Sequence, residues 1–207
     1  QSRLRLEAEI VRDAHLAASG LLAAKIGGPS VRPALPADIA ALGYANSVKW
    51  QESEGEDRYR RGMYIFFQRT VPFPMLMTFD APNSTTTCTR RDRSNTPLQA
   101  LTLWNDPAFF ECARALSKRV LGEPTLDARL QRAFELCLAR PPGDVELARL
   151  RQLFEDQQRL TRERPKSAAA ILGLEGDVAL PADPVDDASL VAAVRVIMNL
   201  DEFITRD

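Results

Sequence analysis

Proline follows a helix-capping residue twice within a short stretch near the middle of the sequence. The first case is Asn95-Thr96-Pro97 and the second is Asn105-Asp106-Pro107. Side-chain oxygens of asparagine, threonine and aspartate accept hydrogen bonds from the free N–H groups of a first helical turn. Proline at the first helical position costs no helical hydrogen bond, because the N–H group that it lacks would have had no partner within the helix. The two signals therefore predict one helix that begins at Pro97 and a second that begins at Pro107.

The sequence that follows has the period of amphipathic helices. Apolar residues recur at helical spacing over 126–139, from 144 to about 157 and over 187–198. Pro141-Pro142-Gly143 separates the first two segments, with Asp144 expected to cap the second. Residues 173–186 are rich in glycine, proline and aspartate and are expected to form a flexible loop.

The N-terminal half begins with a helix and then loses regular periodicity. Residues 3–19 predict an amphipathic helix that ends at Gly20, whereas Gly27-Gly28-Pro29 and Pro33 interrupt any long element between residues 25 and 56. Residues 60–71 predict a further helix, and residues 72–82 an extended segment. The expected fold class is mainly α: an irregular helical bundle with a loop-rich, Pro/Gly-containing N-terminal half, in a single domain over residues 1–207.

Charge and hydropathy argue against binding to nucleic acid and against insertion into a membrane. The 27 Lys and Arg residues are balanced by 28 Asp and Glu residues, so the net charge of −1 argues against nucleic acid. No apolar run has the length of a membrane span. The sequence begins with Gln1 rather than methionine, and we expect it to be a fragment of a longer protein.

The cysteines and the single histidine do not form a metal or haem motif. Neither a CxxC pair nor a CxxCH sequence occurs, so no cofactor and no metal are expected in this chain. Cys112 and Cys137 lie on apolar helical faces and are expected to be buried. Cys88 lies beside arginines; we favour a thiol that packs inward over a reactive one. His15 has no partner at ligand spacing, and a structural role is expected.

Arginines concentrate immediately before the first Pro-initiated helix. Arg90, Arg91 and Arg93, with Asn95 and Gln99, form a candidate anion site, because guanidinium groups and a helix N-terminus both favour negative charge. An acidic or sulfated glycan, or an acidic segment of a partner, would suit it. The favoured alternative is internal pairing of these arginines with the structural ion-pair candidates Asp80 and Asp106, and with Asp92, which would join the irregular half to the helices.

A hydrolase acting on carbohydrate is the alternative function. It would require a general acid and base, and the candidate pairs are Asp80 with Glu202 or Asp80 with Asp106. Since no established catalytic spacing accompanies these carboxylates, an enzyme is the less favoured interpretation, and no catalytic residue is assigned.

Several separated motifs resemble those of one family. They are Arg12-Asp13-Ala14, Gly27-Gly28-Pro29-Ser30-Val31, Arg60-Arg61 with Tyr64, Phe79-Asp80-Ala81-Pro82, Cys88-x-Arg90-Arg91, Asn95-Thr96-Pro97-Leu98-Gln99-Ala100-Leu101 with Asn105-Asp106, Arg140-Pro141-Pro142 and Asn199-Leu200-Asp201-Glu202-Phe203. Over nearly the whole chain the sequence resembles the planctomycete-type domain of unknown function DUF1553, also called the PSD1 domain. One departure is the loop over 173–184, which is longer and more irregular than the family's usual run into the final helix.

The resemblance implies a context rather than a mechanism. Members are typically the C-terminal part of long exported bacterial proteins that carry a related partner domain and often a cytochrome-c-like domain. It therefore implies a periplasmic or cell-surface location, other domains of the same polypeptide as partners, and any haem in segments outside this chain. The family has no established catalytic residues. The expected function is a non-catalytic binding or structural module.

Overall fold

The computed structural model describes residues 4–35, 50–69, 71–174 and 181–206, which are mainly α-helical, as the sequence predicts. The α-helices are α1 (Ala8–Ser19), α3 (Pro74–Thr78), α4 (Pro97–Asn105), α5 (Pro107–Val120), α6 (Leu126–Leu138), α7 (Asp144–Glu163), α8 (Pro165–Leu172) and α9 (Pro184–Met198). Three short 3-10 turns, η2 (Gly55–Tyr59), η3 (Gly62–Tyr64) and η4 (Asp201–Phe203), and two strands, β1 (Leu4–Arg5) and β2 (Thr205–Arg206), complete the described elements.

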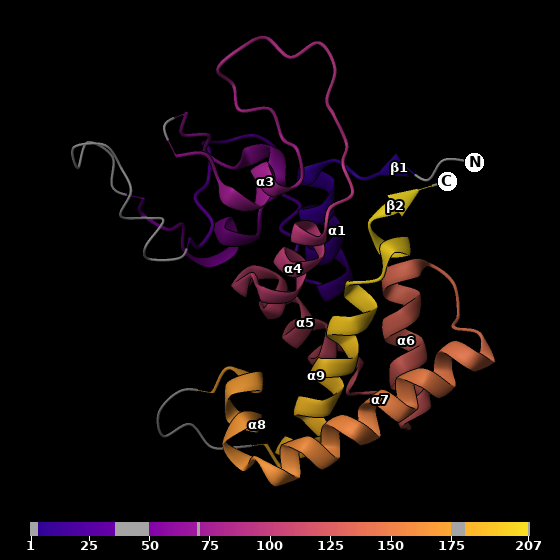
Figure 1. The fold of residues 1–207 in the computed structure, drawn as a ribbon. Coiled ribbons are helices and arrows are strands. Elements are labelled where there is room, and N and C mark those ends of the chain that lie inside the picture. The colour runs from indigo at the N-terminus through magenta and orange to yellow at the C-terminus, as the bar shows by residue number, and fades with distance from the viewer. Residues whose placement is uncertain (1–3, 36–49, 70, 175–180, 207) are drawn as a thin grey trace.

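Helix α9 is the centre of the C-terminal half. It contacts α5, α6, α7 and α8, and Figure 1 shows it crossing the middle of this group. Its sequence is apolar on most sides, as expected for a helix with neighbours all round. Among its buried residues are Ala188, Leu190, Val191, Ala193, Val194, Ile197 and Met198. Burial of this helix fixes the position of α5, on which the N-terminal half rests.

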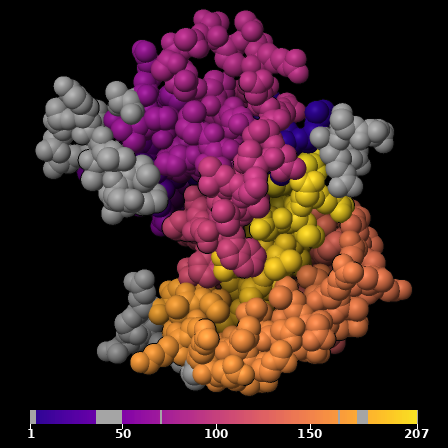
Figure 2. Space-filling model, viewed as in Figure 1, coloured from indigo at the N-terminus to yellow at the C-terminus, as the bar shows by residue number. Residues whose placement is uncertain are grey.

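The N-terminal half is held onto α5 through α1. Helix α1 contacts α5, α3 and η3, and in Figure 2 this half fills the upper part of the molecule above helices α6–α9. Arg60 is completely buried and donates hydrogen bonds to the carbonyl oxygens of Gly27 and Pro29. Its guanidinium also lies 3.9 Å from the ring centroid of Tyr64. The irregular Gly27-Gly28-Pro29 segment is therefore ordered by one buried cation.

The two ends of the described chain meet in a small antiparallel sheet. Strand β1 pairs with β2, with Leu4 opposite Arg206 and Arg5 opposite Thr205. Near this point His15 of α1 is fully enclosed between the rings of Phe109 and Phe203, at centroid distances of 4.5 and 4.7 Å. The expected structural placement of His15 agrees with this burial.

Both helix starts that contain proline are confirmed. Pro97 and Pro107 occupy the first turns of α4 and α5, and Asp106 accepts a hydrogen bond from the backbone N–H of Ala108 at 2.8 Å. Thr96 is the N-cap of α4, but its side chain makes no capping bond. Gly20 ends α1 in the left-handed conformation with φ 80°, which a glycine adopts without strain.

The helix predicted over residues 60–71 is wrong. Among the described residues of this range, the short turn η3 is the only helical element, because Arg60 and Ile65 are extended and form parallel bridges with Ala23 and Val31. Residues 72–82 also differ from the expected extended segment, since α3 lies within them. In both segments contacts with distant parts of the chain override the local pattern.

Other predicted boundaries move by a few residues. Helix α1 begins at Ala8, since the residues before it belong partly to β1. Gly143 rather than Asp144 is the N-cap of α7, and the side chain of Glu146 accepts from the Gly143 N–H at 2.7 Å. The loop expected over 173–186 ends earlier, because α9 begins at Pro184; residues 175–180 lie outside the described part.

Candidate functional site

The most prominent irregular segment is residues 81–93, which we call the arginine loop. Figure 1 shows it extending from α3 above the body of the molecule before the chain enters α4. Its two ends are joined by Asp80, whose Oδ2 accepts from the backbone N–H and the hydroxyl of Ser94, both at 2.7 Å. The Gln99 side chain also donates to Asp80, at 3.4 Å. Closely spaced ends define an Ω-loop, a class of surface loop that frequently carries function.

Two of the three arginines pair with the start of α1. The terminal nitrogens of Arg91 donate to both carboxylate oxygens of Glu9, at 2.9 and 3.1 Å, and one of them also lies 3.3 Å from Glu7. Arg93 donates to Glu7 at 3.0 Å. These hydrogen bonds, chiefly the one to Glu9, raise the pKa of Arg91 above its ordinary value. The expected pairing with Asp80, Asp92 or Asp106 is not what the structure shows.

Arg90 has a different environment. It is exposed, and within the described residues it forms no ion pair. It lines a hollow of about 500 Å³ together with Asp80, Asn83, Thr86 and other residues of the arginine loop. Cys88 lies on the same wall and is exposed, with its thiol donating to the Arg90 carbonyl at 3.1 Å, so the expected inward packing of Cys88 is wrong.

The side chains of Asn95 and Gln99 form hydrogen bonds that hold the base of the arginine loop in place. Arg5, a buried residue of β1, donates to the side-chain oxygen of Asn95 and lies 3.2 Å from Asp201. Gln99 is 1% exposed, and its amide donates to the Thr78 carbonyl and the Ser94 hydroxyl, both at 3.1 Å. Of the five residues predicted as an anion site, Arg90 alone lines the hollow without a side-chain partner among the described residues.

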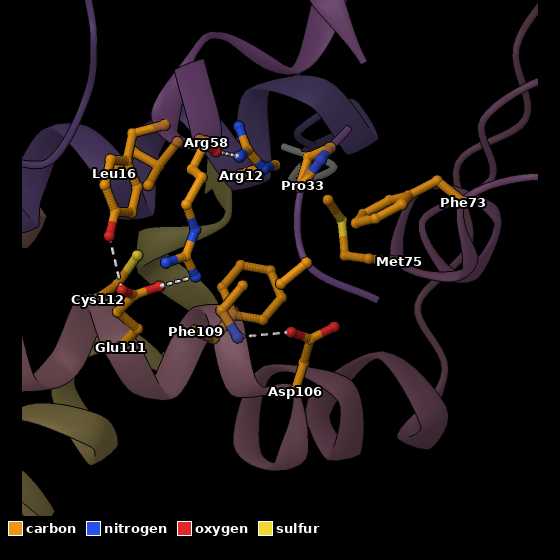
Figure 3. A pocket seen from close by; sticks show the side chains of 13 residues that line it. Arg12, Leu16, Pro33, Arg58, Phe73, Met75, Asp106, Phe109, Glu111 and Cys112 are labelled. Atoms are coloured by element: carbon orange, nitrogen blue, oxygen red, sulfur yellow. Dashed lines mark hydrogen bonds and ion pairs between the residues drawn. The ribbon is translucent and has the colours of Figure 1, made fainter. Parts of the chain in front are cut away.

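A second cavity lies between α1, α5 and residues 33–34, 58–59 and 73–75 (Figure 3). Arg12 is buried there and donates to the carbonyl oxygens of Arg58 at 2.8 Å and of Arg60 at 2.5 Å. Glu111 accepts from the Tyr59 hydroxyl at 2.7 Å and lies 3.7 Å from the Arg58 guanidinium. Sequence reasoning missed this cavity, since no motif spacing connects these residues.

Burial shifts the pKa values of two groups that line the second cavity. Desolvation raises the pKa of the Asp106 carboxyl, and it raises the pKa of the Cys112 thiol to about 12, so Cys112 remains protonated. The cavity has a volume of about 30 Å³. That space corresponds to roughly one water molecule. The geometry is that of a small packing defect between α1 and α5 rather than a substrate pocket.

The carboxylates expected to act as an acid/base pair lie in separate surroundings. Asp80 lines the hollow of the arginine loop, Asp106 lines the second cavity, and Glu202 lines a third hollow beside Arg140. Arg140 donates to Glu202 at 2.6 and 2.7 Å and also to Glu146, which lowers the pKa of Glu146 to about 2. No cavity in the described residues brings either predicted pair together.

Comparison with known families adds a decisive observation. A family model described as "Protein of unknown function (DUF1553)", PSD1, matches residues 1–154, which is well over half of the 207 residues. The chain belongs to the DUF1553 family. No curated protein and no solved structure matches it.

The DUF1553 match includes the arginine loop and the second cavity, but it ends within α7. Helices α8 and α9 lie beyond it, although α9 packs against α5 and α6 inside the matched residues. The core that supports the arginine loop thus continues past the matched part. Among the described residues, no group of His, Cys, Asp and Glu side chains has a metal-binding arrangement, and no helix is long and apolar enough to cross a membrane.

The hydrogen bonds that Ser94 donates to Asp80 are expected to hold the two ends of the arginine loop together. Asp80→Ala removes the acceptor of three hydrogen bonds and leaves a non-glycine residue at φ 62°. We expect trypsin to cleave at Arg90, Arg91 or Arg93 about tenfold faster, since a local opening free energy lower by about 1.4 kcal/mol gives that factor. Asp80→Asn keeps an oxygen acceptor and tolerates positive φ, so its cleavage rate should stay near that of the wild type. Equal rates in all three proteins would contradict this role of Asp80.

Proposed function

We propose that this DUF1553 chain is a non-catalytic binding module whose arginine loop binds an acidic or sulfated carbohydrate. The observation that carries the proposal is the position of Arg90, which lines the hollow of about 500 Å³ without an ion pair among the described residues. Guanidinium groups bind carboxylate and sulfate through charge-assisted hydrogen bonds. An anionic ligand would give Arg90 the partner that the described fold does not supply.

Part of the remaining lining of the hollow suits a sugar, although the carboxylates of Asp80 and Asp92 also line it. Asn83, Thr86, Thr87 and Thr89 supply amide and hydroxyl groups, which both donate and accept hydrogen bonds. Sugar hydroxyls have the same dual capacity. An acidic glycan therefore matches both the charge of Arg90 and the polar wall beside it.

The wider context of this module belongs to the same proposal. By resemblance to the family, the chain would be part of an exported multidomain bacterial protein, in the periplasm or at the cell surface. Its other partners would be domains of the same polypeptide, with any haem carried by segments outside this chain. A module that binds glycan could attach such a protein to an extracellular polysaccharide.

The experiment is calorimetric titration with a chondroitin sulfate tetrasaccharide, with maltotetraose as the neutral comparison. We expect Arg90→Ala to weaken binding of the sulfated probe by about tenfold or more, because a hydrogen bond to a charged group contributes about 1.5–3 kcal/mol. Raising the salt concentration should also weaken it, since the pairing is exposed.

The matched control is Arg149→Ala. Arg149 is exposed on α7, so this substitution removes the same charge from a helix that does not line the hollow. Its affinity should equal that of the wild type. Equal affinity of Arg90→Ala and wild type, or equal binding of the neutral and sulfated probes, would disprove the proposed site.

A further inference from the structure

Arg91 and Arg93 already hold anionic groups, and those groups come from the chain itself. The two terminal nitrogens of Arg91 bind both oxygens of Glu9, which is the forked geometry by which a guanidinium recognises a carboxylate or a sulfate. Glu7 receives one contact from each of the two arginines, at 3.3 and 3.0 Å. Two arginines of the loop are thus in a binding geometry, with glutamate carboxylates in the place of a ligand.

These ion pairs are accessible and can exchange. The side chains of Arg91, Arg93 and Glu7 are 36, 38 and 39% exposed, and that of Glu9 is 21% exposed. Ion pairs at the protein surface are weak because water and salt screen them. A ligand that offers a comparable anion at higher local concentration can therefore replace either glutamate.

The glutamates have a second favourable environment once they are released. Glu7 is the N-cap of α1, with no side-chain capping bond, and Glu9 lies in the first turn. The unpaired N–H groups and the dipole at a helix N-terminus stabilise negative charge. The carboxylates would keep a partial partner in α1 after they lose the arginines, so the exchange leaves neither of them isolated.

The base of the arginine loop is independent of these ion pairs. Asp80 and Ser94 join its ends, and Gln99 binds both of them. Release of Arg91 and Arg93 from α1 would free the guanidinium groups and leave the loop attached to α3 and α4. The loop can therefore change partner without local unfolding of its base.

We propose that Glu7 and Glu9 are internal competitors for the acidic ligand of the arginine loop. A ligand with several anionic groups displaces them, so that Arg91 and Arg93 join Arg90 in binding it. This inference rests on the proposed function, and it adds that the ligand carries several anionic groups. A single small anion would pair with Arg90 and would leave Arg91 and Arg93 paired with the glutamates. The ion pairs that Glu7 and Glu9 form at the start of α1 thus set the affinity of the arginine loop for its ligand.

The test compares Glu7→Gln/Glu9→Gln with the wild type in titrations with the chondroitin sulfate tetrasaccharide and with inorganic sulfate. We expect the double variant to bind the tetrasaccharide about three- to tenfold more tightly, the factor that corresponds to removing weak surface pairs. Inorganic sulfate should bind the wild type too weakly to displace the glutamates. Adding Arg91→Ala to the double variant should return the affinity for the tetrasaccharide to that of the wild type or below.

The control for net charge is Glu155→Gln/Glu163→Gln, which removes two exposed carboxylates from α7. If this control gains as much affinity as the double variant, the effect is one of total charge and the inference is overturned. Unchanged or lower affinity of the double variant overturns it too. The proposed function survives those results as long as the wild type binds and Arg90→Ala weakens binding, so the two failures can be distinguished. Absence of binding in both the wild type and the double variant refutes both.

Discussion

Gly62→Ala is expected to lower the free energy of unfolding by about 2 kcal/mol. A Cβ atom at this position would lie 2.9 Å from the Cα of Glu9 and 3.0 Å from its carbonyl oxygen, which are backbone atoms of α1. Relief of this overlap requires α1 to move away from residues 60–64, and overpacking of this kind costs about 1–3 kcal/mol. The same movement would lengthen the bond from the Gly62 N–H to Asp13, now 2.6 Å.

The matched substitution is Gly122→Ala. No atom lies within 4 Å of a Cβ built at Gly122, and its backbone does not have positive φ. Alanine restricts the unfolded chain more than glycine does, so this variant should be unchanged or more stable by about 0.4–1 kcal/mol. Urea unfolding followed by circular dichroism measures the free energy of unfolding of both variants. The same sign of change in the two variants would mean that the contact between Gly62 and Glu9 does not limit the packing of α1.

His15 is expected to make the fold sensitive to acid between about pH 6.5 and pH 4. Complete burial lowers its pKa from the ordinary 6.5 to about 4, against the raising effect of the Val11 and Met198 carbonyl oxygens. Because the pKa is depressed in the folded state, the unfolded state binds the proton first as the pH falls. The stabilisation from neutral His15 is therefore complete above pH 6.5 and is lost as the pH falls to 4. One pKa unit corresponds to about 1.4 kcal/mol, so the full loss is about 3 kcal/mol.

Two measurements test this expectation. His15 is the only histidine, so its imidazole resonances in an NMR titration report its pKa in the folded protein without overlap. Glutamine does not titrate in this range. Between pH 7 and pH 4 the free energy of unfolding of the wild type should therefore fall by about 3 kcal/mol more than that of His15→Gln. Parallel pH profiles for the two proteins, or a pKa near 6.5, would show that the burial of His15 is not linked to protonation.

The features that the sequence predicted well are those that depend on neighbouring residues. Pro97 and Pro107 begin helices because the N–H group that proline lacks would have no partner in the first helical turn. Asp106 caps α5 because the N–H group that donates to it, that of Ala108, lies two residues away in the chain. The burial of Cys112 and Cys137 followed from helical periodicity in the same way. These signals need no knowledge of the tertiary fold.

The features that the sequence did not predict depend on distant partners. Arg93 binds Glu7, which lies 86 residues earlier, although Asp92 is adjacent to it. Residues 60–71 have a helical pattern, yet Arg60, whose side chain is buried, and Ile65 are extended on either side of the short turn η3, in which Gly62 closely approaches α1. In both cases the deciding contact comes from α1 or from the Gly27–Pro29 segment, and local spacing carries no information about it.

The pairing of β1 with β2 has a consequence for the order in which the protein can fold. The imidazole of His15 lies near the Met198 carbonyl, 183 residues further along the chain, and Leu4 pairs with Arg206. Synthesis delivers α1 long before these partners, so the loop-closure entropy of almost the whole described chain must be overcome before α1 is enclosed. Helices α5 to α8 follow one another through short connections, and α5 and α6 contact α1. The surroundings of His15 and of β1 are thus completed only after α9 and the residues that follow it have been made.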